Sequence, residues 1–330
     1  MLLLLPLAMS GCYLAHVALG QARLLNARRP IAEVIADPST PAELRERLGW
    51  IHEVRAFATR LGLSVGDQYT SYVEWPGDRV VTTVVATSPG SLEPHSFWFP
   101  IVGHVPYKGF FDPARAHAEA EDLRANGFDV CEVPVRAYST LGWFEDPVTG
   151  PMLRGSDGAL VETLLHELVH ATVFVASEAD FNEGVASFVG EEGSVRFFAE
   201  TAGAEAAARE RDRVTDARIL ASALLAFRRE VEGLYASEAR PDERAAQRAA
   251  AEVRARAAIA RLGFVTRDPI RLAADLRLSD ACLALTRTYA ADVDGYVATL
   301  AALEGSLPSF VTRLRKAAET KNPRAALLAP

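Results

Sequence analysis

The sequence has only three cysteines and three methionines, and it has no surplus of basic residues. Three cysteines are too few for the disulfide framework of a small secreted domain, and their spacing matches no cysteine-rich zinc site. Lysine and arginine total 35 against 43 aspartates and glutamates, which gives a formal charge of −8. A chain with this balance lacks the basic surface that binds polyphosphate, and we expect no nucleic-acid partner.

Long apolar runs are also missing, because no stretch approaches the roughly 18 residues of a membrane-spanning helix. The 330 residues are 49% hydrophobic and 24% charged, which is the composition of an ordinary globular protein. This composition excludes a wholly disordered or fibrous chain. The length indicates one large domain or two domains of common size.

The chain begins with a short leucine-rich run that ends in Met9-Ser10-Gly11-Cys12. A short apolar segment followed by small residues is typical of a signal peptide, and small residues directly before a cysteine resemble a bacterial lipobox. We therefore predict a signal peptide over residues 1–11 and a lipid anchor on Cys12. The alternative is a buried N-terminal helix, since apolar residues continue from Tyr13 to Leu25.

A lipidated Cys12 places the protein in the bacterial cell envelope, facing the periplasm. The next residue is Tyr13 and not aspartate, which favours the outer membrane over retention in the inner one. Cys131 and Cys282 remain, and we expect both as free, buried thiols.

Hydrophobic spacing predicts helices at three- and four-residue steps and strands where β-branched and aromatic residues gather. Pro76-Gly77-Asp78 separates two strand-like segments, so we expect a hairpin there. Strands are predicted over 69–75, 79–86, 96–102 and 129–138. Helices are predicted over 41–61, 113–126, 159–176, 181–201, 203–237, 240–262, 279–303 and 309–319.

The strongest chemical signal is His166-Glu167-Leu168-Val169-His170. Two histidines four residues apart project from one face of an α-helix and can bind one metal ion together. This spacing is the His-Glu-x-x-His pattern, in which two neutral imidazoles hold zinc and the glutamate acts as a general base. Apolar residues on the other faces predict a buried helix, where such polar side chains need partners.

A catalytic zinc site uses three protein ligands and keeps one position open for water. Glu183 follows His170 by thirteen residues, within Asn182-Glu183-Gly184-Val185-Ala186. A turn and a second, antiparallel helix would bring it back beside the histidine pair. We therefore predict Zn²⁺ bound by His166, His170 and Glu183. The competing carboxylates are Glu178, Asp180, Glu191 and Glu192.

The Asn-Glu-Gly-x-Ala segment resembles the glutamate helix of gluzincin peptidases. More closely, nearly the whole chain resembles the bacterial putative aminopeptidase family of zinc-dependent lipoproteins. The resemblance rests on both zinc helices and on four further segments: Gly-Gln-Ala-Arg-Leu-Leu at 20–25, Gly-His-Val-Pro-Tyr-Lys-Gly-Phe-Phe at 103–111, Ser-Thr-Leu-Gly-Trp-Phe-Glu-Asp-Pro at 139–147 and Leu-Tyr-Ala-Ser at 234–237.

The resemblance implies a zinc metallopeptidase acting near peptide N-termini, with Glu167 as the base. The chain departs from the gluzincin pattern at Ser187, where thermolysin-type enzymes have an aspartate, and its histidine-to-glutamate spacing is shorter. A different set of residues around the ligands is therefore expected, with Glu162 as one candidate. A further donor should stabilise the oxyanion, and the candidates are Tyr107, Tyr138 and Tyr289.

Together these features predict an α+β fold. A zincin-like region over 12–202 has a small, mostly antiparallel sheet and two metal-site helices, and a mainly helical region over 203–330 packs on it. The predicted partners are a peptide substrate and a lipid membrane. The alternative function is a lipid-anchored scaffold or binding lipoprotein with a structural zinc site. Glu167 favours the peptidase, because a structural site has no use for a base.

Overall fold

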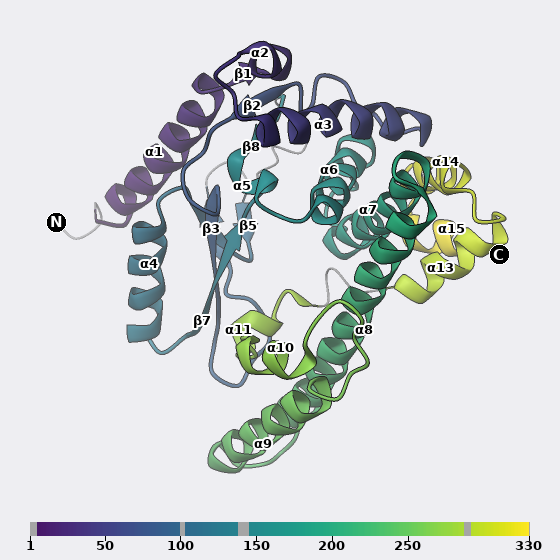
Figure 1. Cartoon of the computed structure of the whole chain (residues 1–330). Helices are drawn as coiled ribbons and strands as arrows, with labels where there is room; N and C mark the ends of the chain where they lie inside the picture. The colour runs from purple at the N-terminus through teal and green to yellow at the C-terminus, as the bar shows by residue number, and fades with distance from the viewer. Residues whose placement is uncertain (1–4, 100–102, 138–144, 287–291, 330) are drawn as a thin grey trace. The chain divides into compact units, whose positions relative to one another are not determined.

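The structure of the chain is a computed structural model that describes residues 5–99, 103–137, 145–286 and 292–329 (Figure 1). It confirms the α+β class, with small sheets and about 62% helix. Within the described ranges, no helix combines the length and the apolar character needed to cross a membrane.

The chain forms two compact units, and each unit is built from three separate stretches of sequence. Unit 1 contains residues 1–28, 74–138 and 219–286, and unit 2 contains residues 29–73, 139–218 and 287–330. The predicted division into regions 12–202 and 203–330 stays a prediction about the chain's domains. The two units are described separately.

Unit 1 is organised around a three-stranded antiparallel sheet with the order β6-β3-β7. β3 (Val81–Thr87) is central, and β6 (Lys108–Phe110) and β7 (Asp129–Val135) pair with its two edges. α4 (Pro113–Ala125) lies along this sheet in Figure 1 and buries Ala116, Ala120 and Leu123 against it. β4 (Phe97–Phe99) and β5 (Gly103–Val105) form a separate antiparallel pair.

Helices complete unit 1 and hold a second apolar cluster around Phe227 and Val231 of α8. A disulfide joins Cys131 in β7 to Cys282 in α11, so the expectation of two free thiols is wrong. The two cysteines are 151 residues apart, and their pairing depends on α11 packing on β7. The helices are α1 (Leu5–Asn26), α8 (Gly203–Tyr235, whose first half belongs to unit 2), α9 (Pro241–Ile259), α10 (Pro269–Asp275) and α11 (Asp280–Leu283).

Unit 2 is mainly helical, and its small sheet has the order β1-β2-β8. β1 (Arg29–Pro30) pairs with β2 (Ser71–Val73) in antiparallel orientation, and β8 (Val148–Thr149) pairs with β2 in parallel. The helices are α2 (Ile31–Ala36), α3 (Ala42–Arg60), α5 (Gly150–Leu153), α6 (Asp157–Thr172), α7 (Ala179–Thr201), α13 (Val293–Ala302), α14 (Leu307–Ala318) and α15 (Pro323–Leu328).

Two local predictions are wrong. The segments on either side of Pro76-Gly77-Asp78 do not form a hairpin, because β2 pairs with β1 and β8 while β3 pairs with β6 and β7. The predicted helix over 279–303 is interrupted, because α11 ends at Leu283 before a turn and α13 starts after Asp292, which has a left-handed conformation; residues 287–291 lie outside the described residues.

Candidate metal centre

α6 carries the His-Glu-x-x-His segment and is fixed by its apolar side. Its start is capped by the Ser156 side chain, which accepts a hydrogen bond from the Ala159 amide. Leu164, Leu165 and Leu168 are at most 1% exposed, so the turn of α6 that carries His166 is anchored in the core of unit 2. This anchoring leaves the polar face of the helix, with both histidines, directed toward α7.

α7 returns beside α6, as Figure 1 shows, and two of its glycines allow a close approach. A Cβ atom on Gly190 would lie 2.9 Å from the carbonyl oxygen of Glu162, and one on Gly193 would lie 2.6 Å from Leu165 Cδ1. A larger residue at Gly190 would meet the α6 backbone and push the helices apart, whereas one at Gly193 would displace the end of the Leu165 side chain. The predicted arrangement of two adjacent metal-site helices therefore depends on these glycines.

The link between the helices is pinned by Asn182, which is 3% exposed and stands next to Glu183. Its side-chain oxygen accepts a hydrogen bond from the Val175 amide at 2.9 Å, and its side-chain nitrogen donates to the Val175 carbonyl at 2.7 Å. Both polar groups of Val175 are thereby satisfied inside the protein. The paired contact fixes the start of α7 and, with it, the position of Glu183.

His166, His170 and Glu183 come together as one cluster, with one ligand atom of each within 4.8 Å of the others. The two Nε2 atoms are 3.1 Å apart. Glu183 Oε2 lies 3.2 Å from His166 Nε2, and Oε1 lies 3.4 Å from His170 Nε2. Ligand atoms about 2.0–2.1 Å from a tetrahedral zinc ion are about 3.3 Å apart, so the three donors fit three corners of that tetrahedron.

The outer nitrogen of each imidazole has a different environment. His166 Nδ1 lies 3.4 Å from the Ser187 hydroxyl, so a serine contacts the ring where thermolysin-type enzymes have an aspartate. A proton on Nδ1 leaves Nε2 free to act as a ligand. His170 is 4% exposed, and within the described ranges its Nδ1 has no hydrogen-bond partner.

The pKa values of the cluster favour a positive charge beside the carboxylate. Burial alone raises the pKa of Glu183, but hydrogen bonds from His166 and His170 outweigh this effect and lower the pKa to about 2. Burial lowers the pKa of His166, and the Glu183 contact together with the charge of Glu167 reverses this and raises it. Either a proton or a metal cation satisfies such a site.

Glu191 and Glu192 are not part of the cluster, because arginines of α8 hold them. Glu192 accepts hydrogen bonds from Arg211 at 2.7 and 3.0 Å and from Arg218 at 3.0 Å. Glu191 accepts one from Arg218 at 2.7 Å. In the described part of the chain, Glu178 and Asp180 likewise belong to no group of three potential metal ligands.

Glu162, proposed from sequence as a neighbour of the ligands, forms an ion pair with Arg213 and not a hydrogen bond with an imidazole. Arg213 also donates to Glu210, which in turn accepts from the Ser194 hydroxyl at 2.7 Å. The charge of Glu162 still acts on His166 and contributes to its raised pKa. Its influence on the site is therefore electrostatic.

Glu167 is half-buried, and no hydrogen bond or ion pair holds its carboxylate among the described residues. Tyr69, which sequence reasoning missed, is 2% exposed, and burial and then the charges of Glu167 and Asp146 raise its pKa well above 10. Tyr69 has a φ of 59° and lies just before β2. In the sequence it is one of several aromatic and β-branched residues, so nothing distinguishes it from an ordinary strand residue.

Of the three tyrosines named from sequence, Tyr107 lies within the described residues. Tyr107 is 46% exposed and belongs to unit 1, whereas the cluster belongs to unit 2. Tyr138 and Tyr289 lie outside the described residues.

The sequence model of a family described as "Putative aminopeptidase" matches residues 12–328. No curated protein and no solved structure matches the chain.

Proposed function

Because the chain belongs to the putative aminopeptidase family, we propose that it is a zinc-dependent peptidase that cleaves near peptide N-termini. Family membership supports peptidase activity in general. The observation that carries the zinc proposal is the convergence of His166, His170 and Glu183 at distances of 3.1–3.4 Å. We also interpret α6, α7 and the small sheet of unit 2 as a zincin-like arrangement.

The donor set of two imidazoles and one carboxylate suits zinc, and three protein ligands leave a position for solvent. A bound zinc ion supplies Lewis acidity and lowers the pKa of a coordinated water toward 7. The chain's contribution is to hold the ligands in place. Buried leucines fix α6, and Asn182 fixes the start of α7.

Glu167 is proposed as the general base. It follows a ligand directly in α6, and no ion pair in the described ranges neutralises its carboxylate. A free carboxylate can accept a proton from the attacking water and return it to the leaving amine. A glutamate held by an arginine, as Glu192 is, would be a much poorer base.

Tyr69 is proposed as the donor that stabilises the developing oxyanion. A phenol is protonated at neutral pH, and burial with the charges of Glu167 and Asp146 raises the pKa of Tyr69 further, so its hydroxyl is a hydrogen-bond donor. Its electrostatic coupling to Glu167 supports a position near the reacting groups. Tyr107, Tyr138 and Tyr289 stay the alternative candidates predicted from the sequence.

The test is Glu167→Gln, with Glu53→Gln on the exposed surface of α3 as a matched control. Zinc content, aminoacyl-substrate cleavage and cleavage of internally quenched peptides are measured for each protein. We expect Glu167→Gln to keep one zinc per chain and to lose at least about a hundredfold in kcat. The control is expected to match the wild type in both readouts.

The outcomes separate the proposal from its rival. Equal activity in Glu167→Gln and wild type would remove the general-base role. Zinc without cleavage of any peptide in the wild type would favour the lipid-anchored scaffold with a structural zinc site. Cleavage of aminoacyl substrates but not of N-terminally blocked peptides supports the aminopeptidase assignment.

We further propose that Cys12 is acylated and anchors the protein in the cell envelope, with the outer membrane as its site. The Cys131–Cys282 disulfide supports a compartment outside the cytoplasm, because such bonds persist in oxidising environments such as the periplasm. A palmitate analogue should label the wild type and not Cys12→Ser. Labelling that persists in the variant would refute the anchor.

A further inference from the structure

The folded part of unit 1 begins directly after the proposed lipidation site. Cys12 lies within α1, which runs without a break from Leu5 to Asn26. The Tyr13 ring packs at centroid distances of 5.1 Å from Phe99 and 5.3 Å from Phe110, and its hydroxyl donates to the Gly109 carbonyl at 2.9 Å. An acylated Cys12 therefore has no flexible linker, and α1 itself must lie at the membrane surface.

The other side of α1 packs on unit 1. The Phe111 amide donates to His16 Nε2 at 3.2 Å. A Cβ atom on Gly20 would overlap the Phe111 ring, so the helix approaches Phe111 closely there. These contacts fix which face of α1 points outward.

The outward face of α1 is entirely apolar over its first turns beyond Cys12. At 100° per residue, positions 14, 15, 18, 19 and 22 occupy one half of the helix. All five are exposed, and Leu19 is 70% exposed. The exposed side of a helix on a globular protein normally carries polar residues, so this face resembles an interfacial helix. We call it the α1 apolar face: Leu14, Ala15, Ala18, Leu19 and Ala22.

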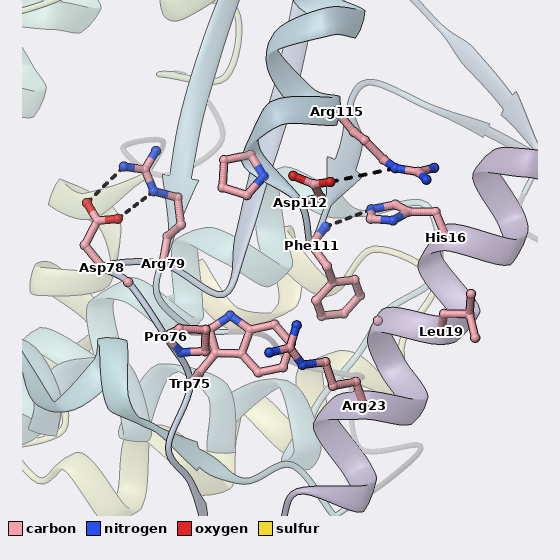
Figure 2. Close-up of a pocket in the computed structure, with 13 residues that line it drawn as sticks. His16, Leu19, Arg23, Trp75, Pro76, Asp78, Arg79, Phe111, Asp112 and Arg115 are labelled. Carbon is pink, nitrogen blue, oxygen red and sulfur yellow. Dashed lines mark hydrogen bonds and ion pairs between the residues drawn. The ribbon is translucent and has the colours of Figure 1, made fainter.

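Two side chains at the borders of this face are typical of a membrane interface. Trp98 is 60% exposed and lines the same hollow as Tyr13 and Leu14. Arg23 extends from α1 over the Trp75 ring, as Figure 2 shows, and its guanidinium carbon lies 5.0 Å from the ring centroid. It has no acidic partner among the described residues. Tryptophan rings prefer the headgroup level, and a long arginine reaches from an apolar face to the phosphates.

The charges around the α1 apolar face largely cancel. Arg79 pairs with Asp78 at 2.7 Å, and Arg115 lies 3.8 Å from Asp112. Among the residues that the structure describes, Arg23 is thus the one arginine of this surface without an acidic partner, and it is not part of a polybasic patch. Attraction to this surface must come mainly from burial of apolar side chains, and salt should affect it little.

We propose that the α1 apolar face, with Trp98 and Arg23 at its borders, lies on the phospholipid bilayer and holds unit 1 in a fixed orientation at the membrane. The inference rests on the proposed acylation of Cys12 and is independent of peptidase activity. It differs from a simple lipid tether, which would leave the folded chain free to move in solvent.

The test uses a nitroxide spin label at a single introduced cysteine. Once Cys12 is acylated and Cys131 is bonded to Cys282, any new cysteine is the only free thiol. The lipidated protein, processed to begin at Cys12 and carrying Leu19→Cys or Trp98→Cys, is placed in phosphatidylcholine vesicles. The matched control is Val253→Cys in α9, which is 68% exposed and belongs to the same unit.

We expect the labels at positions 19 and 98 to favour oxygen over a water-soluble nickel relaxant, and the label at 253 to show the reverse. Equal, water-like accessibility at all three positions would overturn the proposal even if the acyl anchor is present.

A second measurement needs no acyl chain. A protein of residues 12–330 with Cys12→Ser, which lacks the leucine-rich signal segment, should pellet with sucrose-loaded phosphatidylcholine vesicles, and adding Leu19→Glu should weaken binding about tenfold or more. Val253→Glu should change nothing. Identical binding of the Leu19→Glu and Val253→Glu proteins would also overturn the proposal, and a failure of zinc binding or catalysis would leave these results untouched.

Discussion

Replacing Glu191 with glutamine is expected to change the stability of unit 2 in a way that depends on pH between 5 and 8, whereas the effect of replacing Glu192 should be constant over that range. The two residues are adjacent on α7, and their side chains are 15% and 7% exposed. Burial raises the pKa of Glu191 to about 7, because Arg218 only partly offsets it and Glu162 adds repulsion. For Glu192, burial is outweighed by hydrogen bonds from Arg211 and Arg196, which lower the pKa to about 2.

The signs follow from proton linkage. A Glu192 pKa below its ordinary 4.5 stabilises the fold above pH 4.5, and this contribution disappears as the pH falls through about 2. A Glu191 pKa above 4.5 means that the folded chain binds more protons than the unfolded chain between pH 4.5 and 7. Stability attributable to Glu191 therefore falls as the pH rises through this range.

The magnitudes are similar. Each pKa shift corresponds to about 3 kcal/mol in the free energy of unfolding, or about 2–3 kcal/mol after allowance for solvent screening. We expect Glu192→Gln to lower the free energy of unfolding by about 2–3 kcal/mol equally at pH 5 and pH 8. We expect the free energy of unfolding of the Glu191→Gln protein, measured relative to that of the wild type, to rise by about 2–3 kcal/mol between pH 5 and pH 8.

The assay is urea unfolding followed by circular dichroism at 222 nm at pH 5, 6, 7 and 8, with linear extrapolation to water. Glu53→Gln serves as the exposed control. If the free energy differences for Glu191→Gln and Glu192→Gln are both independent of pH, the electrostatic description of this arginine–glutamate network is wrong.

Three further predictions test individual contacts. Asn182→Ala removes both hydrogen bonds to Val175, so it should cost about 2–4 kcal/mol of stability in urea unfolding and weaken zinc binding in chelator competition. Unchanged zinc affinity would contradict the positioning role of Asn182. Tyr69→Phe should lower kcat about tenfold to a hundredfold and leave zinc content unchanged, and an unaltered kcat would exclude it as the oxyanion donor. Replacing Cys131 and Cys282 with serine removes a disulfide between residues 151 positions apart and should lower the free energy of unfolding by about 3–5 kcal/mol. A change under 1 kcal/mol would show that α11 stays on β7 without the bond.

The parts of the site that depend on local spacing were predictable. His166 and His170 are one helical turn apart, so their shared face follows from the helix alone. Glu183 follows from a helix, a short link and a returning helix. The packing that makes this return close depends on Gly190 and Gly193, whose role is visible only when α6 is placed against them.

Other features depend on contacts between distant segments. The disulfide between Cys131 and Cys282 requires α11 to reach β7, and no local pattern indicates this pairing. The wrong hairpin prediction at residues 76–78 has the same cause, because turn chemistry does not reveal which strands are partners. Tyr69 is a candidate because it is buried and because the charge of Glu167 acts on its hydroxyl, and sequence spacing shows neither property.

The measurement that tests the central claim most directly is zinc binding by the purified full chain. Wild type should bind one equivalent of zinc, and Glu183→Gln and His170→Ala should each bind it at least about a hundredfold more weakly in competition with a chelator. The exposed-surface variant Glu53→Gln should bind like wild type. A wild-type chain that binds no zinc, or variants that bind it as tightly as the wild type, would contradict the account.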